Sequence, residues 1–308
     1  MTTAFKGPLI VYGQRPPRGT AGSENPRLGP SIFWGGIGFI DSRWGYNRTV
    51  PGAFGWHGSN LLLDVVPSTL SAVNIAAAQV PVAATALTLV SATGSGVTVL
   101  AAAQGVATAG NIAIIPSGAL ALDGVGGFVG FGSADPTNSS WQDIKFYDPT
   151  KSVARNVRIT SAGNDSGATF TVAGYDIYGV AMSETITGSN GSVAPGKKAI
   201  KYIVSVTPAG TLSGSNVSVG TGDVYGFSLS VALFPYVDIF WNNALITSPT
   251  GFVVPDATSP ATATTGDVRG TYAVQSASDG SKRLTVYYAP NLAAISAGST
   301  GLVGVTQA

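Results

Sequence analysis

The chain contains a single histidine, His57, and no cysteine, which limits the chemistry that its side chains can perform. Ser-His-Asp catalysis and multi-histidine metal sites would both have to use this one imidazole. The lack of cysteine excludes thiolate nucleophiles, thiolate metal sites and disulfides. His57 is preceded by Trp56 in a segment rich in glycine, where packing or a loop hydrogen bond is the simplest role for it. We therefore expect no catalytic or metal-binding histidine.

Two pairs of carboxylates are candidates for glycoside hydrolysis or Ca²⁺ binding, because both need oxygen ligands brought together. The pairs are Asp143 with Asp148 and Asp165 with Asp176. The sequence around Asp165, Asn-Asp-Ser-Gly, lacks the alternating acidic positions of a calcium loop and is typical of a hairpin turn. We expect these carboxylates to form hydrogen bonds within turns. The alternative is that they bind an ion without forming a dedicated calcium loop.

Two glycine-rich stretches, residues 124–130 and 220–226, have the composition of phosphate-binding loops. In neither stretch does the last glycine have the spacing of a dinucleotide-binding loop. No helix is predicted after either stretch, so no helix N-terminus is available to bind a phosphate. No Lys-Ser or Lys-Thr pair completes a P-loop. We interpret both as turns or strand glycines. The sequence therefore predicts a protein that is not an enzyme and that uses no metal and no other cofactor.

Charge is scarce along the whole chain: 10% of the 308 residues are charged, against about 25% in typical globular domains. The net charge is only +1, and 41 glycines accompany 18 prolines. Such a surface suits a protein that is covered by neighbours in an assembly. The stretch between Asp64 and Asp123 holds no charge, but polar residues, glycine and proline interrupt every apolar run, so we expect no membrane partner.

Residues 1–58 differ from the rest because prolines and glycines are too dense for regular elements. This segment has six basic and two acidic residues, a net charge of +4, and it is rich in aromatics. An extended arm of this kind can lie along a partner surface. Its basic residues are too dispersed for us to expect nucleic acid as the partner. The residues that we expect to bind the partner are Arg15, Arg18, Arg27, Trp34, Arg43, Trp44 and Trp56.

From about residue 60, short β-type segments recur between turn signals, and no helix longer than two turns is indicated. Alternation of polar and apolar residues is sharpest at 156–160 and 168–173, and 180–187 is a plausible hairpin return. We predict an all-β fold, with an extended N-terminal arm followed by two β-sandwich or jelly-roll-like units. The expected divisions are the arm (1–58), a first β unit (59–135), a second β-sandwich unit (136–247), and a long connection with closing strands and a small-residue tail (248–308).

Several of these turn-and-strand motifs resemble segments of tailed-bacteriophage structural proteins. They include residues 85–92, 115–124, 148–151, 163–167 and 183–188, and the similarity covers roughly residues 60 to 288. The resemblance implies a virion component, and it provides no catalytic residues.

Together with the arm and the sparse charge, the resemblance leads us to expect a decoration (cement) protein on the outside of the capsid. Its partners would be the major capsid protein and copies of itself, most plausibly as a homotrimer. The start of the chain lacks a secretory signal, so we expect synthesis in the host cytoplasm and a final location on the virion surface. One alternative is a neck, tail or head-fibre component. Another is a host-surface carbohydrate-binding protein, with Trp141, Trp241 and the many tyrosines as sugar platforms.

Overall fold

The computed structural model describes residues 60–101, 103–108, 111–125, 128–131, 144–147, 149–231, 234, 237–258 and 260–288. These residues form strands, turns and short 3-10 turns such as Pro149–Lys151, which confirms the predicted all-β class. The chain divides into two compact units. One comprises residues 1–62, 233–239 and 285–299, and the other comprises 63–232, 240–284 and 300–308. The predicted arm, 1–58, lies outside the described residues.

The larger unit contains a five-stranded antiparallel sheet of order β11-β10-β13-β6-β3. Its strands are β3 (Val97–Val99), β6 (Leu120–Leu122), β10 (Ala168–Tyr175), β11 (Ala181–Thr187) and β13 (Tyr202–Gly210). Strands β10 and β11 form the predicted hairpin, with Thr169 opposite Thr187 and Tyr175 opposite Ala181. Buried and half-buried residues alternate along the whole of β10, as expected for a strand with one face in a core.

A second sheet of the same unit has the order β12-β9-β14-β18-β17, and β2 also pairs with β14. Its strands are β2 (Ala76–Gln79), β9 (Arg155–Ser161), β12 (Val193–Pro195), β14 (Val217–Gly226), β17 (Phe252–Val253) and β18 (Thr271–Ala273). Strand β14 is the longest and pairs with β2, β9 and β18. It is therefore the central strand of this sheet.

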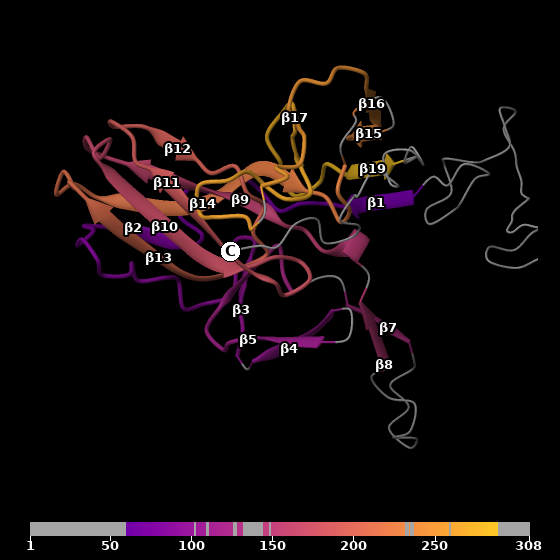
Figure 1. Cartoon of the computed structure of the whole chain (residues 1–308), viewed down its shortest axis with the longest axis horizontal. Helices are drawn as coiled ribbons and strands as arrows, with labels where there is room; N and C mark the ends of the chain where they lie inside the picture. Colours follow the sequence, from indigo (N-terminus) through magenta and orange to yellow (C-terminus); the bar gives the residue numbers. More distant parts are fainter. Residues whose placement is uncertain are drawn as a thin grey trace, which may run out of the picture. The chain divides into compact units, whose positions relative to one another are not determined.

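The two sheets pack face to face as a β-sandwich (Figure 1). One apolar core contains side chains from both sheets, such as Phe170 and Val206 from the first and Ile159 and Val219 from the second. Burying such side chains contributes about 1.5–3 kcal/mol each. Strands β2, β3 and β6 belong to this sandwich although they precede residue 135. The sandwich thus combines strands that the sequence assigned to separate units.

A further sheet has the order β1-β19-β15-β16. Its strands are β1 (Asn60–Val65), β15 (Val237–Trp241), β16 (Ala244–Ile246) and β19 (Leu284–Tyr288). Two separate hairpins are formed by β4 (Gln104–Thr108) with β5 (Asn111–Ile115), and by β7 (Phe128–Phe131) with β8 (Ile144–Tyr147). No helix among the described residues has the length and apolar character needed to cross a membrane.

Candidate functional site

The structure describes few of the residues that the sequence analysis singled out. The seven partner-binding candidates of the arm, together with His57, Trp141, Asp143 and Asp148, lie outside the described residues. Trp241 is described and is only 5% exposed, with its indole Nε1 donating a hydrogen bond to Ser276 Oγ at 2.9 Å. The expectation that Trp241 forms an exposed sugar platform is therefore wrong.

Asp165 and Asp176 do not form a carboxylate pair, because they flank the two ends of the eight-residue strand β10. Such a strand spans about 26 Å. Asp165 Oδ1 accepts a hydrogen bond from the backbone N–H of Ser213 at 2.7 Å. Asp176 Oδ1 accepts the N–H groups of Tyr178 and Val180, both at 2.8 Å. The Asp176 carboxylate thus stabilises its own turn, and the Asp165 carboxylate connects its loop to the loop of Ser213. The predicted hairpin turn at Asp165 is wrong, because the flanking strands β9 and β10 belong to different sheets.

Arg155 is among the largest fully buried side chains of the described residues, and it connects strand β14 with the loops of Ser68 and Asp123. Its Nε donates to Gly222 O at 2.8 Å, and its two Nη groups pair with Asp123 at 3.1 Å and Asp223 at 2.9 Å. Nη1 also donates to the carbonyl of Ser68 at 2.9 Å. Two carboxylates and two carbonyls thus compensate one guanidinium, which is the arrangement that a buried charge requires.

A second buried ionic cluster is centred on Arg269. Its Nη1 lies 3.0 Å from Asp176 Oδ2, and its guanidinium carbon lies 5.4 Å from the centre of the Tyr178 ring. Asp267 accepts the backbone N–H groups of Arg269 at 2.9 Å and Ala199 at 3.0 Å. Burial raises the pKa of the Asp267 carboxyl, although the nearby guanidinium acts in the opposite direction. The cluster fixes the turn after β10 against the loop before β18.

Three further buried charges are bound to backbone groups. Glu184 Oε1 accepts the N–H of Lys197 at 2.6 Å, and burial raises the pKa of this carboxyl. Lys198 Nζ donates to Thr262 O at 2.7 Å. Lys201 Nζ donates to Leu122 O at 2.6 Å and to Gly124 O at 2.8 Å, and burial lowers the pKa of Lys201 to about 8. These charges connect loops and are not presented to solvent.

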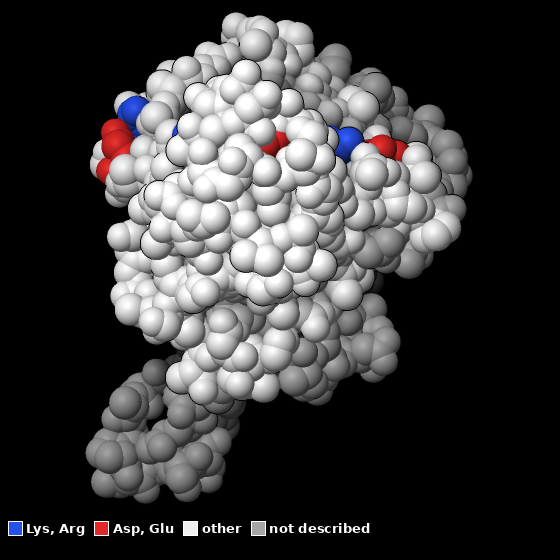
Figure 2. All heavy atoms as spheres, turned by 90° about the vertical axis from the view of Figure 1, so that its left-hand side faces the viewer, with Lys and Arg blue, Asp and Glu red and all other residues white. Residues whose placement is uncertain are grey.

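One end of the sandwich is almost free of charge. We call this end the sandwich tip and define it by the loops 162–167, 188–192 and 211–216. Hydrogen bonds join them: Asp165 N–H to Ser189 O, Gly191 N–H to Gly163 O, and Ala162 N–H to Asn216 O. The only charged residue in these loops, Asp165, is fully buried. Figure 2 shows this end of the sandwich with mainly uncharged residues facing the viewer.

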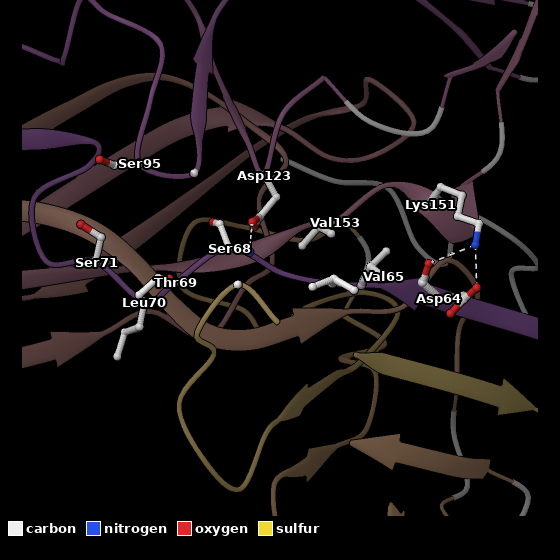
Figure 3. Close-up of a pocket in the computed structure, with 13 residues that line it drawn as sticks. Asp64, Val65, Ser68, Thr69, Leu70, Ser71, Ser95, Asp123, Lys151 and Val153 are labelled. Carbon is white, nitrogen blue, oxygen red and sulfur yellow. Dashed lines mark hydrogen bonds and ion pairs between the residues drawn. The ribbon is translucent and has the colours of Figure 1, made fainter. Parts of the chain in front are cut away.

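A polar pocket of about 800 Å³ lies elsewhere on the same unit (Figure 3). Its walls are the segment 64–71, the turn before β3, the loop after β6, the region around the 3-10 helix, and the loop before β19. Asp64 lies at one side, where its carboxylate binds Lys151 at 2.6 Å and Arg283 at 2.6 Å. Asp123 lies in the wall next to Ser68, whose N–H it accepts at 2.6 Å.

The described residues contain no group of three or more His, Cys, Asp or Glu side chains arranged to hold a metal ion. Comparison with family models, curated proteins and solved structures finds no match to this chain. The geometry of the tip, the pocket and the ionic clusters is therefore the structural basis for any functional proposal.

Proposed function

We propose that this chain is a structural virion protein of a tailed bacteriophage that binds the outside of the assembled capsid as a decoration (cement) protein. It has no enzymatic activity in this proposal. The observation that carries the proposal is the sandwich tip, whose loops contain no charged residue apart from the buried Asp165. The resemblance of residues 60–288 to phage structural proteins supports the same reading.

The tip is well suited to contacts between copies of the chain. Around a rotation axis, identical surfaces meet one another, so any charge near the axis faces its own copies. Juxtaposed like charges cost several kcal/mol in an interface. The exposed residues of the tip loops, such as Asn164, Ser166, Asn190 and Ser213, carry no charge. We place these residues near the axis of a homotrimer on the capsid surface.

The N-terminal segment is the capsid-binding element in this proposal. Residues 1–58 form an extended basic arm that lies on the major capsid protein, and jelly-roll-like units follow it. Trp34, Trp44 and Trp56 supply the buried anchors, while Arg15, Arg18, Arg27 and Arg43 meet carboxylates of the shell. Because the protein binds only the assembled shell, it stabilises that shell by mass action against the pressure of packaged DNA.

A neck, tail or head-fibre component remains the alternative within the same class, since sparse charge and β-structure suit those positions too. The carbohydrate-binding alternative loses one of its two proposed platforms, because Trp241 is buried. Sugar stacking at that tryptophan is therefore not part of the proposal.

The arm hypothesis is tested by deleting residues 1–55 and mixing the truncated protein with undecorated expanded capsids. We expect a folded body with an unchanged far-ultraviolet circular dichroism spectrum that no longer sediments with the capsids. Full-length protein is the positive control, and binding should weaken with salt because the arm is basic. If the folded truncated protein binds capsids as full-length protein does, the arm is not the capsid-binding element.

A further inference from the structure

The polar pocket beside Asp64 and Asp123 has no role in the proposed capsid binding. Its volume of about 800 Å³ lies in the range of ligand sites, about 300–1,000 Å³. It is built entirely from residues of the larger unit. Its lining includes Thr69, Ser71 and Ser95, as labelled in Figure 3. A pocket of this size with hydroxyl groups in its wall can hold a polar organic molecule.

The charged groups of the pocket wall are neutralised within the protein. Asp64 is 4% exposed and binds Lys151 and Arg283, so two cations share one carboxylate. Asp123 is 5% exposed and pairs with the buried guanidinium of Arg155. These internal pairs leave no buried charge in the wall without a counter-ion, so a neutral ligand meets no unpaired buried charge there.

The wall groups left for a ligand are mainly hydroxyls and short apolar side chains. Thr69 and Ser95 are exposed, and their hydroxyls have no hydrogen-bond partner among the described residues. A hydroxyl both donates and accepts, which matches the hydroxyl groups of a sugar. Val66 and Leu70 also line the pocket, and the C–H groups of a sugar ring can pack against their apolar surface.

Two residues of the same wall have positive φ although they are not glycine. Ser95 has a φ of 50° and Asp123 a φ of 52°. Such conformations cost of order 1 kcal/mol or more and cluster at ligand-binding sites. The adjacent Gly96 leaves no room for a β-carbon, because Ser68 Oγ occupies that position. The strained turn and the Ser68 segment are thus held close together along the pocket.

From the cavity, its neutralised charges and its exposed hydroxyls, we propose that this pocket binds a neutral oligosaccharide. None of the residues that line the pocket belongs to the sandwich tip. A particle protein with this site would hold a glycan on the virion surface while it performs its structural role.

The proposal is tested with full-length protein on a glycan array that carries neutral and acidic oligosaccharides. The best neutral oligosaccharide is then titrated calorimetrically against wild type and two matched variants. Thr69→Trp fills the pocket from an exposed wall position, and Thr247→Trp makes the same change at an exposed position that does not line the pocket. Ser71→Trp is a second blocking variant, to be used if Thr69→Trp does not fold.

We expect a neutral glycan to bind, with affinity reduced at least about tenfold by the folded blocking variant and unchanged by Thr247→Trp. We also expect the affinity to be nearly independent of salt, because no net charge is paired on binding. The proposal is overturned if no neutral glycan binds, if only acidic glycans bind with strong salt dependence, or if the folded blocking variant binds like wild type.

Discussion

Arg155 Nη2 lies 2.9 Å from Asp223 Oδ1, although the two residues are 68 positions apart in the chain. The carboxylate also accepts hydrogen bonds from the hydroxyls of Ser278 at 2.6 Å and Tyr225 at 2.9 Å. A single ion pair therefore connects the start of β9 with β14 and with the loop that leads to β19. Its removal should affect the whole sandwich.

We predict that Arg155→Met lowers the free energy of unfolding by about 3–5 kcal/mol, because it leaves two partly buried carboxylates without the fully buried cation that they share. Urea unfolding followed by tryptophan fluorescence measures this loss. The control is Lys282→Gln, which breaks the partly exposed pair with Asp279 at 3.4 Å and should cost no more than about 1 kcal/mol. Equal effects of the two substitutions would show that the Arg155 cluster has no special role.

Lys201 should give the protein a distinctive stability profile at alkaline pH. Burial lowers its pKa from 10.5 to about 8, so between these values the unfolded chain binds a proton that the folded protein has released. The free energy of unfolding should therefore rise with pH in that window. Comparison of wild type with Lys201→Met across pH 8 to 10.5 isolates this contribution. The variant should lack the rise, and parallel curves would contradict the prediction.

Asp64 should contribute to stability on the acid side. Hydrogen bonds from Arg283 and Lys151 lower the pKa of this carboxyl from 3.8 to about 2, against the effect of its burial. Its contribution is present above pH 3.8 and is lost as the pH falls towards 2. Asp64→Asn should be less stable than wild type at neutral pH, and the difference should shrink over this range. A pH-independent difference would exclude the ion pairs as its cause.

The sandwich tip can be tested by adding charge to it. Asn190→Lys places a positive charge on an exposed tip loop, and Thr247→Lys places one on an exposed loop outside the tip. We expect both proteins to remain folded, but only Asn190→Lys to dissociate the proposed trimer, because three lysines would meet around the axis. Light scattering coupled to size-exclusion chromatography measures the oligomer. Trimers of unchanged stability in both variants would place the axis elsewhere.

Local patterns predicted the local parts of the fold. The alternation along residues 168–173 and the return at 180–187 predicted β10 and β11, because a hairpin depends on near neighbours. The pairing of β6 with β13 could not be predicted in this way, since Leu120 pairs with Ile203 across a long sequence separation. The sequence therefore indicated two units where the strands share one sandwich.

The functional surfaces were harder to predict for the same reason. Alternation at 156–160 suggested that Asn156 faces solvent, but it is buried and bonds Gly196 O at 2.7 Å and Val224 N at 3.0 Å. The burial of Arg155 and Lys201 could not be predicted either, because their partners lie far along the chain. The charge-free segment between Asp64 and Asp123 did indicate sparse surface charge, and it predicted neither the tip nor the pocket.

The central claim, that this is a capsid decoration protein, is tested most directly by its copy number in purified phage particles. Quantitative mass spectrometry against the major capsid protein measures that number. The account predicts hundreds of copies per particle, in a ratio set by the symmetry of the shell. A dozen copies or fewer would assign the chain to the neck or tail, and absence from the particles would contradict a virion role altogether.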